Sequence, residues 1–372
     1  MENQKICSKK VKPEEQEYKK RTYQNLIHFI KLGLTDSVKF LFNNNHDNFF
    51  DLSLRDSNGY TLLSLAIAVD KEELFDYLIE KGFSVSDEVK NGSNILHVAA
   101  YLGRFTFIHK IIEKDSSLLN LRSYSGKTPL YYACENGFYL ATFALLKAGA
   151  NPNIADNYGR TPLHISSSSN KRLISKTLIS FGCNTNAENE LGLTPIMTVC
   201  GLKNWEMLYF LAENNCDINY ISTNVITNII NILSLFGEDE IIQKLLTDYN
   251  LRFDDNHRYS PIYVACSKNN FSTMSLLFKH GAKVCIHTKE LIKEKLTREI
   301  PENCEKFRKF LKETNTILQE ADEYQELVSF LDEIFVSEGD VTFFENDESF
   351  IGLLESNFDV VEESRPRKRI KN

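Results

Sequence analysis

The sequence predicts an all-α fold in which short helices stack in pairs to form a solenoid. Three observations predict it. A short motif headed by Thr or a similar residue returns at a nearly constant interval from residue 61 to residue 260. Apolar residues recur at fixed distances after that position, and Gly stands two residues before it in five copies. One such copy cannot bury its own apolar face, so neighbouring copies must stack to form a core.

The repeat is clearest in three consecutive copies, which read GKTPLYYA at 126–133, GRTPLHIS at 159–166 and GLTPIMTV at 192–199. The same step extends this register in both directions along the chain. A degenerate eighth copy, aligned on Gln24, is expected to precede the others. The seven clear copies are headed by Thr61, Asn94, Thr128, Thr161, Thr194, Thr227 and Ser260.

Each position of the copy predicts a structural element. Thr at the head position can cap a helix, and the Pro that follows suits the first helical turn. The preceding Gly permits a tight turn. An apolar pair in the second half of each copy, such as Leu145–Leu146, predicts a second helix. In the sixth copy this pair lies one residue late, at Leu245–Leu246. Each copy is therefore expected to be a helix–turn–helix with a hairpin tip.

These residues resemble the ankyrin repeat, whose signature is Thr-Pro-Leu-His-x-Ala at a period of about 33 residues. The resemblance covers 23–286, the larger part of the chain. It implies a protein-binding surface on the concave face, formed by hairpin tips and by the ends of first helices. Copies six and seven depart from the pattern, with Val225 and Arg258 in place of Gly.

Tyr and Arg are common in the energetic centres of protein interfaces, and the expected concave face is rich in them. For any single Tyr, packing against the next tip is an equally good explanation. The predicted partner-binding residues are Tyr60, Tyr101, Leu102, Tyr124, Lys127, Glu135, Tyr158, Arg160, Leu191 and Leu193.

No catalytic motif, phosphate-binding loop or metal-ligand spacing stands out, so we expect neither an enzyme nor a cofactor. His97 and His164 occupy the His position of the motif and are expected to join hydrogen bonds between repeats. Cys183 and Cys216 occupy matching positions in successive copies, and we interpret them as small buried residues rather than metal ligands. The eight cysteines are scattered, which is typical of reduced thiols in the cytosol or nucleus.

The net charge of −8 is unevenly distributed. Residues 313–364 hold 16 acidic residues and no Lys or Arg, whereas 365–372 hold five basic residues. The body, 23–312, is neutral and carries no periodic basic stripe, which argues against direct nucleic-acid binding. No apolar run is long enough to cross a bilayer, so no membrane span is predicted. We expect a monomer with a protein partner.

Outside the repeats, 1–22 is expected to be a flexible basic arm and 287–335 a helical extension. Within the extension, apolar residues from Phe307 to Leu331 follow a heptad pattern. A cap on the exposed end of the solenoid is favoured over a weak coiled coil. The segment 336–372 is expected to be an acidic, disordered tail with a basic terminus.

Acidic and large apolar residues alternate in 332–363, which resembles a transactivation segment, and FDVVEE at 358–363 resembles a SUMO-interacting motif. A solvated tail that keeps the protein soluble is the alternative. The terminus resembles a nuclear localisation signal, although it could instead pair with the acidic tail. The basic residues are Arg365, Arg367, Lys368, Arg369 and Lys371.

We therefore expect an interaction scaffold or adaptor with access to nucleus and cytoplasm. The alternative is a regulator of a transcription factor, because the overall plan resembles that of the IκB family. The paired-serine degron of that family is absent: Asp36–Ser37 is followed by Val38 instead of Gly.

Overall fold

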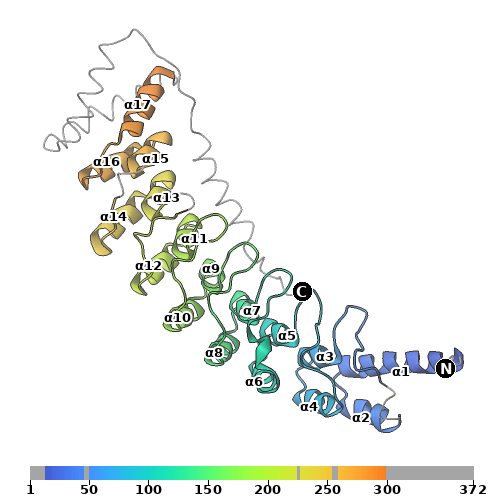
Figure 1. The fold of residues 1–372 in the computed structure, drawn as a ribbon. Coiled ribbons are helices and arrows are strands. Elements are labelled where there is room, and N and C mark those ends of the chain that lie inside the picture. The colour runs from blue at the N-terminus through green and yellow to red at the C-terminus, as the bar shows by residue number, and fades with distance from the viewer. Residues whose placement is uncertain (1–12, 46–49, 224–226, 254–258, 299–372) are drawn as a thin grey trace, which may run out of the picture. The chain divides into compact units, whose positions relative to one another are not determined.

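The computed structural model describes residues 13–45, 50–223, 227–253 and 259–298. These residues form helices joined by turns (Figure 1). Apart from an isolated bridge between Arg55 and Thr61, the described ranges contain no β-structure. The predicted all-α fold is confirmed.

The chain divides into two compact units, residues 1–157 and 158–372. In the first unit, α3, α5 and α7 pack side by side, and α6 packs against α8, so the helices form two layers (Figure 1). The helix pairs of this unit are α1 (Pro13–Lys31) with α2 (Thr35–Asn43), α3 (Leu62–Ala68) with α4 (Glu72–Glu80), α5 (Ile95–Tyr101) with α6 (Phe105–Lys114) and the short helix η1 (Ser116–Asn120), and α7 (Pro129–Asn136) with α8 (Tyr139–Lys147).

The second unit repeats the arrangement, with α9, α11, α13 and α15 in contact from one pair to the next. A final helix, α17 (Ile286–Arg298), packs on α15. The pairs are α9 (Pro162–Ser168) with α10 (Arg172–Ser180), α11 (Pro195–Gly201) with α12 (Trp205–Glu213), α13 (Ile229–Phe236) with α14 (Asp239–Asp248), and α15 (Pro261–Ser267) with α16 (Phe271–Lys279).

The helices begin where the capping residues predict. Thr128 adopts an extended conformation, and its hydroxyl accepts a hydrogen bond from the Tyr131 N–H, three residues on. Thr61, Thr194 and Ser260 cap their helices in the same way. The side-chain oxygen satisfies one of the backbone donors that a helix start leaves unpaired, which fixes where the first helix begins.

The sixth copy differs from the prediction. Its cap is Asn228, not Thr227, because the Asn228 side chain accepts the Asn231 N–H at 3.0 Å. The cap therefore lies one residue later than the regular step from Thr194 to Ser260 predicts. This one-residue shift also explains the late apolar pair, since Leu245 then stands as far from its cap as Leu145 stands from Thr128.

The two ends of the repeat array also differ from the composition-based boundaries. Helix α1 begins at Pro13, so the second half of the predicted arm is helical. Leu26 and Ile30 of α1 are fully buried, as expected for the degenerate first copy. At the other end, α17 starts at Ile286, one residue before the predicted extension 287–335, and its Leu291 packs on the cluster of Leu235, Tyr263 and Val264. The extension beyond residue 298 lies outside the described residues.

Candidate functional site

A groove of about 410 Å³ lies across the first helices of the first unit. Its lining comes from α3, α5 and α7 and from the hairpin tips that precede α3 and α5. The lining is mainly apolar, with Leu65, Val89, Val98 and Leu102 among its residues. Such a groove, with a few polar groups along it, is the usual form of a binding site.

Three tyrosines, one from each of three successive copies, line this groove: Tyr60, Tyr101 and Tyr132. Tyr60 and Tyr101 are 36% and 38% exposed. The rings of Tyr101 and Tyr132 meet edge to face, with centroids 5.9 Å apart. The groove therefore offers a rigid aromatic surface, which can bury large area at low entropic cost.

His97 lies in the groove lining and is held at both ring nitrogens. Its Nδ1 accepts the Asn94 N–H at 3.1 Å, so Nε2 carries the proton and donates to the Lys127 carbonyl at 3.0 Å. Burial lowers the pKa of His97 to about 4, against the weaker opposing effect of its backbone hydrogen bonds. A neutral imidazole with both nitrogens used is a structural bridge between repeats, as the sequence indicated.

His164 makes the equivalent bridge in the second unit. Its Nδ1 accepts the Thr161 N–H, and its Nε2 lies 3.0 Å from the Leu193 carbonyl. The expectation that both motif histidines join hydrogen bonds between repeats is confirmed.

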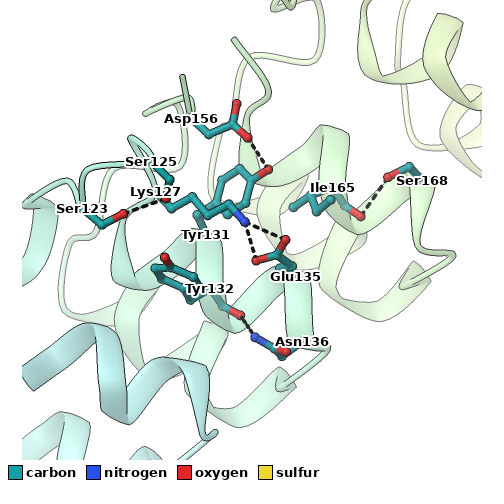
Figure 2. A network of polar contacts seen from close by, with 10 residues as sticks. All are labelled: Ser123, Ser125, Lys127, Tyr131, Tyr132, Glu135, Asn136, Asp156, Ile165 and Ser168. Carbon is teal, nitrogen blue, oxygen red and sulfur yellow. Dashed lines mark hydrogen bonds and ion pairs between the residues drawn. The ribbon is translucent and has the colours of Figure 1, made fainter. Parts of the chain in front are cut away.

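Lys127 and Glu135, both predicted to contact a partner, bind each other. The Lys127 Nζ lies 2.8 and 3.0 Å from the two carboxylate oxygens of Glu135 (Figure 2). The same ammonium group lies over the rings of Tyr131 and Tyr132, 5.2 and 5.4 Å from their centroids. The buried Tyr131 hydroxyl donates in turn to Asp156 at 2.8 Å (Figure 2). This network supports the Tyr132 wall of the groove.

Tyr124 projects from the tip that precedes α7 and is 72% exposed. Its hydroxyl donates to Glu88 at 2.9 Å, and its ring covers Gly92 in the preceding tip. A Cβ at Gly92 would lie only 2.3 Å from the Tyr124 ring, so this contact requires glycine. Tyr124 therefore does pack on its neighbour, while one face of it stays open to solvent.

The predicted residues of the second unit are placed differently. Tyr158 is largely exposed, and the Arg160 guanidinium lies over its ring at 5.0 Å. Leu191 is half-buried. Leu193 is 0% exposed, so its prediction as a partner contact is wrong. Its backbone is held on both sides, by Asn189 and by His164, and its side chain belongs to the core.

The sequence analysis missed several groove residues that share one position. Leu65, Val98 and Tyr132 each stand four residues after the cap of their helix. This position directly follows the bridging residue and is the unspecified position x of the Thr-Pro-Leu-His-x-Ala signature. An aromatic or apolar residue recurring there in successive copies is the signal that identifies the groove.

Cys183 and Cys216 are free, buried thiols. Burial raises the pKa of both Cys183 and Cys216 to about 12, which keeps the thiols protonated. No group of three potential metal ligands occurs in the ranges that the structure describes. Likewise, none of the described helices is both long and apolar enough to span a membrane. The predicted nuclear localisation residues, the acidic segment and the heptad pattern all lie outside the described residues.

Stacked helix pairs with hairpin tips and a groove across the first helices define a helical-repeat protein. A family model for ankyrin repeats, in three-copy form, matches residues 83–156 and 139–222. Residues 83–222 of the chain therefore carry ankyrin repeats.

Known relatives agree with this assignment. The chain is similar to an ankyrin repeat protein of Acanthamoeba polyphaga mimivirus, 25% identical over 213 residues, which are 56% of this chain and 28% of that protein. It is 34% identical over 117 residues to an ankyrin repeat protein of Borreliella burgdorferi, covering 31% of this chain and 27% of the relative. A Saccharomyces cerevisiae protein named for the 26S proteasome regulatory subunit p28 is 34% identical over 108 residues, 29% of this chain and 47% of that protein. The matched segments thus span less than half of each relative.

Proposed function

We propose that this chain is a non-enzymatic scaffold or adaptor that binds a protein partner through the groove on α3, α5 and α7. Ankyrin repeats generally mediate protein–protein interactions and are typically not enzymes. The observation that carries the proposal is the aromatic lining contributed by Tyr60, Tyr101 and Tyr132. Their hydroxyls have no hydrogen-bond partner among the described residues. A partner can therefore bury apolar area and complete hydrogen bonds at the same place.

The test is direct binding with a blocked groove. Ala68 lines the groove at the end of α3 and is exposed, so Ala68→Trp fills the groove without entering the core. Ala148, at the end of α8, is exposed and is not among the groove-lining residues, so Ala148→Trp is the matched control.

A partner is first isolated with the full chain, and its affinity for each variant is then measured by calorimetry. We expect Ala68→Trp to weaken binding by about tenfold or more, as for a hot-spot position, and Ala148→Trp to leave it unchanged. Equal affinity of both variants and the parent overturns the groove as the interface.

The finer proposal is that the protein has access to the nucleus as well as the cytoplasm. It is supported by the basic residues Arg365, Arg367, Lys368, Arg369 and Lys371. Joint replacement of Arg367, Lys368 and Arg369 by Ala should move a fluorescent fusion from nucleus to cytoplasm. An unchanged distribution contradicts this role and favours pairing with the acidic tail.

The alternative of an IκB-like regulator of a transcription factor is supported by the 16 acidic residues in 313–364, which follow the repeats. Deletion of 332–363 separates the two functions. A scaffold retains its partner after the deletion, whereas a regulator that works through this segment loses its effect.

A further inference from the structure

The charge of the groove restricts the partner it can accept. Lys90 is the one lining residue with a full charge in the described part of the chain, since His97 is neutral. Lys90 is exposed and forms no ion pair with any described residue. No acidic residue lines the groove among the described residues. The groove therefore presents an unpaired positive charge beside its apolar surface.

Two carboxylates near the groove, Glu88 and Glu135, already accept hydrogen bonds from other residues. Glu88 accepts the Gly92 N–H at 3.1 Å and the Tyr124 hydroxyl at 2.9 Å. Both oxygens of Glu135 accept from Lys127. A basic residue in a partner would meet the positive charge of Lys90 in a groove that no acidic residue lines among the described residues.

A carboxylate in the partner meets the opposite situation. Lys90 can pair with it, and the hydroxyls of Tyr60, Tyr101 and Tyr132 can donate hydrogen bonds to it. Hydrogen bonds to a charged acceptor are about twice as strong as neutral ones. The apolar floor beside these donors takes an apolar or aromatic side chain.

We propose that the groove selects an extended segment of another protein in which a large apolar side chain is flanked by Asp or Glu. This inference rests on the proposed function and adds the charge class of the partner. Charge complementarity of this kind favours the correct partner mainly by excluding wrong ones.

The experiment selects random dodecapeptides displayed on phage against the full chain, with Ala68→Trp as a counter-selection. Peptides retained by the parent and lost on Ala68→Trp are groove ligands. Asp or Glu should be enriched next to their apolar residues, and Lys and Arg depleted. Groove ligands that are neutral or basic overturn the proposal.

A selected peptide then tests Lys90 directly. Lys90→Glu should weaken binding by about fivefold to tenfold, the range expected when an exposed ion pair becomes a repulsion. The matched control is Lys147→Glu on α8, which changes the net charge equally, and it should stay within about twofold because distant exposed charges are screened. Replacing the peptide's acids by their amides should abolish the difference. Equal losses with both Lys variants overturn the proposal, and thermal melts check that each variant folds.

Two further outcomes separate the possible failures. If Ala68→Trp abolishes peptide binding and Lys90→Glu does not change it, the groove stands as the interface and only the proposed selection for acidic partners is refuted. Peptide binding that Ala68→Trp leaves unchanged refutes the groove itself. Sedimentation of the chain alone completes the test, because self-association abolished by Ala68→Trp would identify a second copy as the occupant and overturn a partner in another protein.

Discussion

The repeat capped by Asn94, in the first unit, and the repeat capped by Asn228, in the second, build the same contact from different side chains. In both, the residue three positions after the cap reaches a backbone carbonyl of the following tip. His97 Nε2 meets the Lys127 carbonyl at 3.0 Å, and Asn231 Nδ2 donates to the Tyr259 carbonyl at 2.9 Å. The position fixes this bridge, and two chemically different residues can fill it.

The two residues differ in what else they do. His97 uses its second nitrogen for the Asn94 N–H, and its ring contacts Tyr132 in the groove, with centroids 5.8 Å apart. Asn231 leaves its side-chain oxygen buried and without a partner in the described part of the chain. In the first unit the bridging residue therefore also packs on the groove lining, whereas in the Asn228 repeat it provides only the bridge.

The largest expected effects lie in the core, and they establish a common baseline for the two repeats. Leu96 and Ile230 each stand two residues after the cap and are at most 1% exposed. Leu96→Ala and Ile230→Ala should each lower the free energy of unfolding by about 2–5 kcal/mol. Hydrogen exchange of the surrounding amides measures the local loss. A loss below about 1 kcal/mol in one repeat alone means that the two cores are not equally packed.

Removing the bridges should separate the repeats. His97→Ala leaves the Asn94 N–H and the Lys127 carbonyl without this partner and should cost about 2–4 kcal/mol. Asn231→Ala removes one such bond together with an already unsatisfied oxygen and should cost less, about 1–2 kcal/mol. Local hydrogen exchange of α5 and α13 provides the comparison. A larger loss of stability in Asn231→Ala than in His97→Ala contradicts the view that His97 makes the more stabilising contacts.

The comparison of His97 with Asn231 also predicts how the stability of the protein depends on pH. Burial lowers the pKa of His97 to about 4 in the folded protein, while an unfolded His has a pKa of about 6.5. Above pH ~6.5 neither state takes up the proton, and between these values only the unfolded state does. The free energy of unfolding is therefore highest, as far as His97 is concerned, above pH ~6.5. It falls as the pH is lowered toward 4 and is about 2 kcal/mol lower at pH 5.

His97→Asn is the control, because it copies the bridging residue of the Asn228 repeat and cannot titrate. The difference in unfolding free energy between the parent and this variant should shrink or reverse between pH 7 and pH 5, as urea titrations can show. A difference that stays constant with pH argues against a buried neutral His97.

A smaller effect tests the cap of the sixth copy. Asn228→Ala removes the acceptor of the Asn231 N–H and should cost about 1 kcal/mol. Thr227 is fully buried, and its hydroxyl has no partner in the described ranges. Thr227→Val should therefore change stability by less than about 0.5 kcal/mol or increase it slightly. The reverse order of the two losses would place the cap at Thr227.

The cap of the sixth copy shows how much of the fold could be predicted from the sequence. A strictly regular step selected Thr227, a good capping residue, and nothing local distinguishes it from Asn228. The late apolar pair at Leu245–Leu246 held the information, because it fits only a cap at 228. Periodicity thus predicted the helices, their caps and their pairing, but single-residue shifts had to come from the packing of the second helix.

The candidate site was harder to predict from the sequence than the fold, since the groove depends on contacts between copies. Tyr101 and Leu102 were found from their place at the end of a first helix, whereas Tyr132 was not, because it lies mid-helix. Residue type alone also misplaced Leu193, which is buried. Lys127 and Glu135 were predicted as partner contacts and do not line the groove; their mutual ion pair joins two positions eight residues apart and had no sequence signature.

The smallest predicted effect extends the comparison to the tips. Glu88 stands six residues before Asn94, and Glu188 six residues before Thr194, in the copy that precedes the Asn228 repeat. Glu88 accepts the Tyr124 hydroxyl, whereas Glu188 accepts the Tyr220 hydroxyl at 3.1 Å and the Thr223 N–H at 2.7 Å. Both carboxylates therefore connect one tip to the next. From the following tip, Glu88 accepts only the Tyr124 hydroxyl, whereas Glu188 also accepts a backbone N–H.

Tyr124→Phe and Tyr220→Phe should each lower the stability only slightly, because solvent competes for exposed hydrogen bonds. Tyr124→Phe should have the larger effect on its tip, since Glu88 then keeps only the Gly92 N–H of its own turn, while Glu188 still holds Thr223. Exchange rates of the Gly92 and Thr223 amides report the two tips separately. The hydrogen bond to Glu88 also raises the pKa of Tyr124, so Glu88→Gln should return the phenol titration toward its ordinary value. A Tyr124 pKa that does not respond to Glu88→Gln would mean that this tip is not held by the carboxylate, and the ring would then rest on Gly92 by packing alone.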